Sequence, residues 1–313
     1  MVKEPNILVV GSLNMDLIVS TNRFPSAGET VLGKDFSTAP GGKGANQAVQ
    51  IGKLGTKVQM VGSIGKDIHG QEILESMKSA GVDVGFVTEN VGSSTGIANI
   101  LIHTDENGIS ENRIIVVPGA NMEITPESIG FLKDKIKDYS IVVLQMEVPM
   151  SVNEAVIDMA YSAGVKVLLN PAPANKIEND VYGKLNYLVP NETEAELLTG
   201  VKIRQANGKI DFDKAKEASD LLLDRGVETV IITLGDSGAV CASKSGFEHF
   251  PSVKGVKAID PTAAGDSFVG AFATEIAAGK PEAEAISFAS RVAAITVSRA
   301  GAQPSLPTRK EVV

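Results

Sequence analysis

One short stretch places two carboxylates beside small residues. Asp260-Pro-Thr-Ala-Ala-Gly-Asp266 leads directly into an apolar segment typical of a helix. Ala263, Ala264 and Gly265 leave the backbone open to close approach, and the N–H groups at a helix start attract anions, which predicts an anion hole ending at Asp266. Asp266 could serve only the helix dipole. Because a carboxylate beside a phosphate-sized site repels its ligand, we favour a general base that accepts a hydroxyl proton during phosphoryl transfer.

Polar residues follow several predicted strands, at the edge where ligands of doubly wound sheets bind. Asn14 and Asp16 stand two residues apart, on one side of an extended segment, which suits a polyol or an Asx-type turn. Glu147 is either a charge at a helix start or an acceptor for a hydroxyl group.

Gly41-Gly-Lys-Gly-Ala-Asn46 places three glycines around a lysine at a helix start. It differs from a P-loop because Thr38 stands where the first glycine should be and Ala45 where a hydroxyl is needed. We expect close backbone approach to a small ligand, with Lys43 and Asn46 as donors.

Two further strand ends are compatible with a nucleotide. Asn191-Glu-Thr-Glu194 is typical of a helix capping box, and it could equally hold Mg²⁺ through water. Thr233–Gly238 ends another strand in small and hydroxyl residues, which fits a backbone-lined nucleotide site or a simple turn.

Short β-branched runs alternate with helical patterns, which predicts an α/β fold with a doubly wound, mostly parallel sheet flanked by helices. The predicted strands are Ile7–Val10, Val58–Val61, Ile141–Gln145, Val165–Leu169, Tyr187–Val189 and Val230–Leu234. The predicted helices are Gly44–Leu54, Gly70–Ala80, Pro126–Lys137, Val152–Ala163, Thr193–Thr199, Asp213–Arg225, Asp266–Ala278 and Glu282–Ser298.

Two stretches, 16–40 and 95–118, hold alternating runs without a helix between them, and Asn107-Gly108 is typical of a hairpin turn. We predict that both form a small β-sheet inserted into a single domain spanning residues 1–313. Their placement suggests a lid over the ligand edge.

Composition excludes several classes of protein. The 313 residues carry 29 Lys and Arg against 38 Asp and Glu, a net charge of −9, so we expect no nucleic-acid partner. Cys241, the single cysteine, lies in an apolar run and is interpreted as a packing residue. No apolar run approaches the roughly 20 residues of a membrane span, and no secretory pattern is present, so we expect a cytoplasmic protein with no membrane partner.

The motifs are more specific together than singly. They resemble the pfkB family of carbohydrate kinases, and its ribokinase branch in particular, from Ile7 to about Pro307. The motifs that carry the resemblance are Gly41–Asn46 (GGKGAN), Asn170–Ala174 (NPAPA), Asn191–Glu194 (NETE), Asp260–Asp266 (DPTAAGD) and Gly301–Ser305 (GAQPS).

The resemblance implies a ribokinase-like fold and a role for each matching position. The sugar would be held by Asn14, Asp16, Gly42, Lys43, Asn46 and Glu147, with Asp266 as the base. ATP would contact Asn191, Thr233, Leu234, Gly235, Asp236, Ser237, Gly238, Gly265, Asp266 and Ser290, and Asn191 with Glu194 would organise Mg²⁺ through water. An activating monovalent cation, usually K⁺, would be enclosed by Asp260, Thr262, Thr296, Arg299, Gly301 and Ser305. It also implies a homodimer formed through the lid.

The predicted function is therefore ATP-dependent phosphorylation of D-ribose at its 5-hydroxyl, with Asp266 as general base and an anion hole at residues 263–266. One alternative is another pfkB-family kinase, acting on deoxyribose, a different sugar or a nucleoside. A non-catalytic sugar-binding regulator is a more distant one, because base and anion hole are both intact. A nicotinamide oxidoreductase is disfavoured because Gly11-Ser-Leu-Asn-Met-Asp16 lacks the G-x-G-x-x-G pattern.

Overall fold

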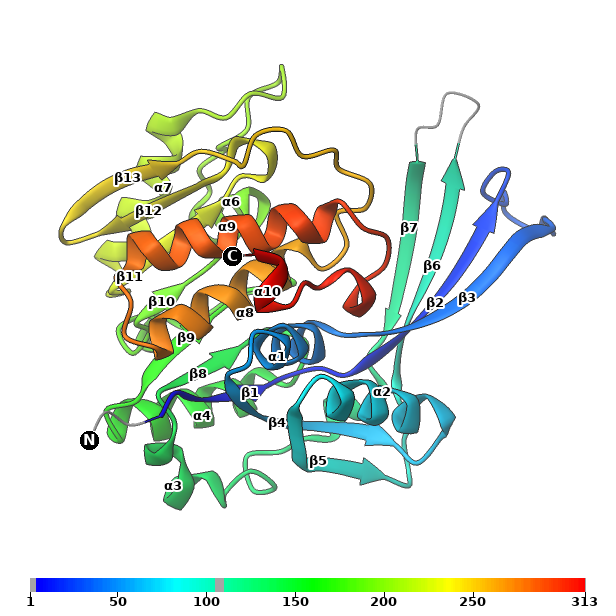
Figure 1. Ribbon diagram of the computed structural model, residues 1–313, viewed down its shortest axis with the longest axis horizontal. Helices are drawn as coiled ribbons and strands as arrows, with labels where there is room; N and C mark the ends of the chain where they lie inside the picture. Colours follow the sequence, from blue (N-terminus) through cyan, green and yellow to red (C-terminus); the bar gives the residue numbers. More distant parts are fainter. Residues whose placement is uncertain (1–3, 105–109, 313) are drawn as a thin grey trace.

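A large sheet with helices on both faces forms the body of the molecule, and a smaller sheet projects from it (Figure 1). This computed structural model describes residues 4–104 and 110–312. Within these ranges the large sheet has nine strands in the order β13-β12-β11-β10-β9-β8-β1-β4-β5, and only β12 and β13 run antiparallel to their neighbours. The strands are β1 (Asn6–Val10), β4 (Lys57–Gly65), β5 (Val82–Asn90), β8 (Ile141–Leu144), β9 (Lys166–Leu169), β10 (Tyr187–Leu188), β11 (Thr229–Thr233), β12 (Ala239–Ser243) and β13 (Gly246–Phe250).

The central strand β1 separates two hydrophobic cores. Ile7 and Val9 face one core, Leu8 and Val10 face the other, and all four are fully buried. Side chains alternate across a strand, so a strand covered on both faces is apolar throughout. This confirms the predicted doubly wound α/β arrangement.

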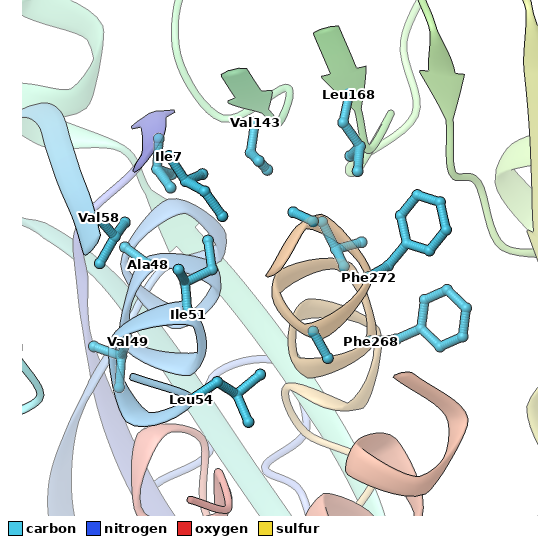
Figure 2. Close-up of a cluster of buried hydrophobic side chains, with 14 of the residues drawn as sticks. Ile7, Ala48, Val49, Ile51, Leu54, Val58, Val143, Leu168, Phe268 and Phe272 are labelled. Atoms are coloured by element: carbon cyan, nitrogen blue, oxygen red, sulfur yellow. The ribbon is translucent and has the colours of Figure 1, made fainter. Parts of the chain in front are cut away.

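The first core lies beneath α1, α2, α8 and α9, and α10 lies beside them near the C-terminus (Figure 1). In Figure 2, α1 with Ala48 and Ile51 lies beside α8, whose Phe268 and Phe272 rings point away from α1, and strand residues such as Val143 lie above the two helices. The helix bounds are α1 (Lys43–Lys53), α2 (Ile68–Ser79), α8 (Ala264–Ala277), α9 (Glu282–Val297) and α10 (Arg309–Val312).

Gly270 allows α8 to approach α1 closely. A Cβ at this position would lie 2.8 Å from the Gln47 carbonyl oxygen and 3.0 Å from Cβ of Gln50. Contacts this short are not tolerated by real side chains, so glycine sets the spacing of the two helices. The N-terminal ends of α1 and α8 thereby meet at the ligand edge of the sheet.

The second core lies on the opposite face of the sheet. The helices that cover it are α3 (Leu132–Lys135), α4 (Met150–Ser162), α5 (Asn179–Tyr182), α6 (Glu192–Thr199) and α7 (Phe212–Asp224). The 3-10 turns of the described chain are η1 (Gly119–Glu123), η2 (Ile136–Asp138), η3 (Gly235–Ser237) and η4 (Gln303–Ser305). Across residues 4–104 and 110–312, no helix has both the length and the apolar character needed to cross a bilayer.

The small sheet joins the two inserted segments. Its strands are β2 (Asn14–Thr21), β3 (Gly33–Gly41), β6 (Gly96–Thr104) and β7 (Ser110–Val117), in the order β3-β2-β6-β7. β2 pairs with β6 in parallel, so segments almost eighty residues apart become neighbours. The predicted Asn107-Gly108 turn lies outside the described residues.

The structure corrects one predicted helix. Residues 126–131 form turns, and only α3 and the adjoining η2 are helical within the predicted span Pro126–Lys137. Gly130 interrupts the span, and the Ser128 hydroxyl donates to the Thr125 carbonyl oxygen at 2.8 Å, which competes with regular helix hydrogen bonding. Strands β5, β12 and β13 were absent from the prediction.

Cys241 lies in β12 and belongs to the first core, as predicted. Burial, followed by the nearby charges of Glu282 and Glu248, raises the pKa of this thiol to about 12. The thiolate is therefore scarcely populated near neutral pH, which argues against a nucleophilic role.

Candidate active site

Asp266 lies in the first turn of α8, at the edge of a cavity of about 200 Å³. The helix starts after Ala263, whose φ of 59° is in the left-handed region and is uncommon for a residue with a side chain. Ala263, Ala264 and Gly265 all line the cavity, and the Ala264 N–H donates to the Pro261 carbonyl oxygen at 3.2 Å. The residues of the predicted anion hole and Asp266 therefore border one cavity.

Two side-chain amides of α1 hold the Asp266 carboxylate. Asn46 Nδ2 donates to Oδ2 at 2.9 Å, and Gln47 Nε2 donates to Oδ1 at 3.0 Å. Each carboxylate oxygen therefore has a protein hydrogen-bond donor. Asp266 is only 7% exposed, yet it still borders the cavity. Asn46 therefore contacts Asp266 with the donor that we expected to face a small ligand. Its Oδ1 is buried and has no protein partner among the described residues.

The cavity brings together residues from five separate segments of the chain. Lys43 comes from α1, Asn191 and Glu194 from the start of α6, and Thr233 from the end of β11. The remaining lining residues are Asn170, Ala172, Val189, Pro261, Ala263, Ala264, Gly265, Asp266 and Val269.

Negative charges surround Lys43. Burial favours its neutral form, but the carboxylates of Asp266, Glu147, Glu194 and Asp16 outweigh that effect and raise the pKa of the Lys43 ammonium group. Lys43 therefore stays charged at neutral pH. A fixed cation beside the predicted anion hole suits a ligand that carries phosphate.

Asp16 is a buried carboxylate on the same side of the molecule. Burial, and then the charges of Glu147 and Asp266, raise its pKa from 3.8 to about 7, although Lys43 acts in the opposite direction. Near neutral pH Asp16 is thus partly protonated and is able to donate or accept a hydrogen bond. That versatility fits recognition of sugar hydroxyl groups.

Glu147 lies after β8 and contacts the start of α1. Its Oε2 accepts hydrogen bonds from Ser12 Oγ at 2.5 Å and from the Lys43 backbone N–H at 3.2 Å. Ser12 Oγ in turn accepts from the Gly44 N–H at 3.3 Å. The carboxylate therefore fixes the glycine-rich loop relative to β1.

The glycines of this loop permit close packing. Gly42 has φ of 88°, and a Cβ there would lie 2.6 Å from the Asn14 backbone nitrogen. A Cβ at Gly41 would lie 2.6 Å from Oδ2 of Asp16. The backbone of the glycine-rich loop thus lies directly against Asn14 and Asp16.

Asn14 is oriented by a residue that the sequence motifs did not reveal. Asn121 in η1 donates from Nδ2 to Asn14 Oδ1 at 2.8 Å and to the Leu13 and Pro118 carbonyl oxygens. Its Oδ1 accepts from the Leu13 N–H at 2.8 Å. Asn121 is 1% exposed and follows β7, so it connects the end of β7 with the turn between β1 and β2.

Asn191 and Glu194 form both hydrogen bonds of a capping box at the start of α6, each 2.8 Å long. The structural interpretation of this motif is thus correct, but it does not exclude a ligand role. Burial raises the pKa of Glu194, an effect that the Asn191 N–H and Lys43 reduce. The box uses only Oε2 of Glu194, and both residues line the cavity.

The Thr233–Gly238 segment lies next to Asn191. Thr233 lines the cavity and bridges Asn191 in parallel pairing. Leu234 is fully buried in the second core, so only its backbone could face a ligand. Gly235, Asp236 and Ser237 form η3, and Gly238 has φ of 91°. Ser290 lies on α9 and is not among the residues that line the cavity.

Asp260 joins two loops beside α8 and α9. Its oxygens accept from the Thr262 N–H at 2.9 Å and the Gly301 N–H at 2.8 Å. Burial opposes ionisation, but these hydrogen bonds outweigh it and lower the pKa of Asp260. The 260–266 turn and the loop at Gly301 are therefore held together by one carboxylate.

The other predicted cation residues surround the same loop pair. The hydroxyls of Thr296 and Ser305 donate to the Val292 and Ala302 carbonyl oxygens, leaving oxygen lone pairs available. Arg299 instead forms an ion pair with Glu311 at 2.8 Å. Among the residues that the structure describes, no group of three or more His, Cys, Asp and Glu could hold a metal.

The sequence motifs did not predict the side-chain hydrogen bonds that five residues make around the site. These residues are Ser12, Gln47, Asn121, Gln145 and Asn170. Ser12 and Gln47 adjoin predicted site residues, so proximity in sequence was an available signal. Asn121 had no such signal, because its partner Asn14 is more than a hundred residues away.

Known proteins are similar to this chain in both sequence and structure. The sequence pattern of the pfkB family carbohydrate kinases matches residues 4–309. A ribokinase of Schizosaccharomyces pombe is 41% identical, with 98% of this chain and 96% of that protein covered. A deoxyribokinase of Salmonella typhi is 36% identical, with 97% and 96% covered. The structure of Arabidopsis thaliana ribokinase complexed with ribose and ATP superimposes with a TM-score of 0.90 at 34% identity, covering 99% of this chain and 97% of that one.

The sequence pattern spans almost the whole chain, and relatives above 30% identity are aligned over nearly their full length. The chain therefore belongs to the pfkB family of carbohydrate kinases.

Proposed function

We propose that this kinase transfers the γ-phosphoryl group of ATP to the 5-hydroxyl of D-ribose. The observation that carries the proposal is the position of Asp266, which borders the same cavity as the start of α8 and as Asn191 and Thr233, two of the residues expected to contact ATP. The names of two relatives support the choice of substrates, one a ribokinase and one a ribokinase complexed with ribose and ATP.

In this mechanism Asp266 accepts the proton of the attacking hydroxyl. Asn46 and Gln47 already hold its two oxygens, so little reorganisation is needed when the sugar arrives. The backbone N–H groups at residues 263–266 stabilise negative charge on the transferred group, and Lys43 adds a fixed positive charge.

The sugar would bind on the opposite side of Asp266 from the nucleotide. Asn14 and Asp16 present an amide and a partly protonated carboxyl group for hydroxyl groups. Gly42 and Lys43 supply the close backbone approach, while Asn46 offers its unpartnered Oδ1. Glu147 would accept a further sugar hydroxyl with the carboxylate oxygen that Ser12 does not occupy.

Mg²⁺ would be held through water by Asn191 and Glu194. Both residues line the cavity, and the capping box leaves one carboxylate oxygen of Glu194 for water. Bound there, the ion would neutralise charge on the ATP phosphates. K⁺ would lie between the 260–266 turn and the loop at Gly301, with Asp260, Thr262, Thr296, Arg299, Gly301 and Ser305 around it. Its role would be to stabilise the turn that forms the anion hole.

The small sheet would act as a lid and as the contact surface of a homodimer. Ile115 and Val117 of β7 and Phe36 of β3 are exposed apolar side chains on one face of this sheet, and Ile114 is exposed on the other face. Such a patch is expected to be covered by another surface. Sedimentation of the intact chain would test the dimer, and cell fractionation would test the expected cytoplasmic location.

A second candidate is phosphorylation of deoxyribose, favoured by the 36% identity to a deoxyribokinase. The deciding experiment measures ADP formation with ATP, Mg²⁺ and K⁺ and a panel of ribose, 2-deoxyribose, other sugars and nucleosides. The highest kcat/KM is expected with ribose. A higher value with deoxyribose or a nucleoside would reassign the substrate, and ATP consumption without any acceptor dependence would contradict the proposal.

A further inference from the structure

Two buried glutamines connect the general base to the interior of the sheet. Gln47 Nε2 donates to Asp266 Oδ1 at 3.0 Å and to Asn170 Oδ1 at 3.2 Å. Gln47 Oε1 accepts a hydrogen bond of 2.7 Å from Nε2 of Gln145, which directly follows β8. Both glutamines are fully buried. We propose that Gln47 and Gln145 form a positioning relay that keeps Asp266 oriented towards the sugar hydroxyl; this inference rests on the proposed function.

The chemistry of the groups determines the direction of the relay. A carboxylate only accepts hydrogen bonds, so Gln47 must turn its NH₂ group towards Asp266. Gln47 Oε1 then faces Gln145, which must also present its NH₂ group. Reversing Gln145 would place two acceptor oxygens against each other.

This arrangement leaves one polar atom unsatisfied. Gln145 Oε1 is buried and has no hydrogen-bond partner in the described part of the chain. A buried acceptor without a partner is destabilising. Gln145 nevertheless keeps this orientation because Gln47, which donates to Asp266, presents only its oxygen to Gln145.

The far end of the relay is fixed to the sheet. The Gln145 carbonyl oxygen accepts from Nδ2 of Asn153 in α4 at 2.7 Å. Gly11 makes room for the side chain, because a Cβ there would lie 1.8 Å from Gln145 Oε1. Gln145 does not contact Asp266 itself, so its influence on the base has to pass through Gln47.

The test compares two substitutions with their combination. Gln47→Met removes the donor and keeps a similar shape, and we expect kcat to fall on the order of 10- to 100-fold, as for loss of a hydrogen bond to a charged group. Gln145→Met should give a smaller loss of kcat. Sugar affinity, measured by calorimetry, should be unchanged in both. The double variant should be no slower than Gln47→Met alone, because both residues act through one contact.

Gln50→Met is the matched control. Gln50 lies one turn further along α1, is also fully buried, and donates to the Pro307 carbonyl oxygen at 2.9 Å, away from the cavity. It should lower Tm but keep the kcat of the unchanged protein. This separates loss of a buried amide from loss of the relay.

The relay would be overturned if Gln47→Met had the same kcat as the wild type. It would also be overturned if the fold-loss of kcat in the double variant equalled the product of the two single losses. If Gln47→Met does not fold, wild-type kcat in Gln145→Met overturns it on its own. A wild-type chain that forms no ADP with any sugar would overturn the proposed function and the relay with it. An active wild type with fully active variants would overturn the relay alone.

Discussion

Asn121 Nδ2 donates a 2.8 Å hydrogen bond to Oδ1 of Asn14, so a residue that follows the small sheet orients a residue expected to hold the sugar. Asn121 also accepts from the Leu13 N–H, which secures the turn after β1. The segment that follows β7 and the predicted sugar-binding residue Asn14 are therefore connected. Movement of one is expected to change the other.

Asn121→Leu should raise the KM for the sugar about 10-fold, because it leaves buried polar groups around Asn14 without partners. The kcat should change much less, since Asn121 has no contact with Asp266. Steady-state kinetics with varied sugar would measure the split. Asn186→Leu is a suitable control, because Asn186 bonds the Val167 N–H far from the site and should affect only Tm. An unchanged KM in Asn121→Leu would contradict the connection.

Asp266→Asn should reduce kcat by a factor of roughly 10² to 10⁴, the usual range for loss of a general base. The substitution keeps the size of the side chain, so sugar binding measured by calorimetry should persist. The amide oxygen of the variant can still accept from Asn46 or from Gln47, which limits the effect on stability. Retention of the wild-type kcat would remove Asp266 from the chemistry.

The pH dependence of stability should reveal the buried Asp16 carboxyl. Its pKa rises from 3.8 to about 7 on folding, so between these values the folded chain keeps a proton that the unfolded chain releases. Stability contributed by Asp16 is therefore present at low pH and is lost as the pH rises towards 7. Asp16→Asn removes this loss, so the Tm of the variant relative to the wild type should increase across that range.

Thermal melts from pH 4 to 8, which span the range of about 4 to 7 in which this linkage operates, would test the Asp16 prediction. Asp35→Asn, on exposed β3 of the same sheet, serves as the control. A Tm difference for Asp16→Asn that does not vary with pH would contradict the assignment. The same variant should bind the sugar more weakly than the wild type. Together the two results would show that Asp16 contributes to sugar binding although its burial lowers the stability of the folded chain near pH 7.

Activity should depend on the monovalent cation. Exchange of K⁺ for tetramethylammonium at constant ionic strength should lower kcat, and Asp260→Ala should weaken the response because it releases the Thr262 and Gly301 N–H groups. Turnover measured across a KCl titration reports both effects. Equal turnover with every monovalent ion would refute the cation site.

Gly270→Ala should lower both Tm and kcat, although alanine favours helices. The added Cβ would lie 2.8 Å from the Gln47 carbonyl oxygen, so α8 must shift away from α1 and carry Asp266 with it. Gly183→Ala is the control, since a Cβ there meets nothing within 4 Å. Thermal melts and kinetics of both variants would show whether helix spacing matters. Wild-type behaviour of Gly270→Ala would contradict this interpretation.

Local patterns predicted much of the fold. Alternating apolar runs and helical periodicity identified the central strands and the helices that cover them, because burial of strands and helices leaves distinct periods in the sequence. The predicted helix at Pro126–Lys137 was largely wrong, since Gly130 and the Ser128 hydroxyl favour turns there. Strands β12 and β13 were missed because a short hairpin at a sheet edge has little periodicity to detect.

The sequence by itself determined which chemical groups the protein has: a carboxylate at a small-residue helix start, a glycine-rich loop around Lys43, and a capping motif at Asn191. Only the tertiary structure decided which groups meet. Gln47, Gln145 and Asn121 act through partners about a hundred or more residues away, and no local spacing encodes such contacts. They arise because parallel strands and two closely packed helices bring distant chain segments to one edge of the sheet.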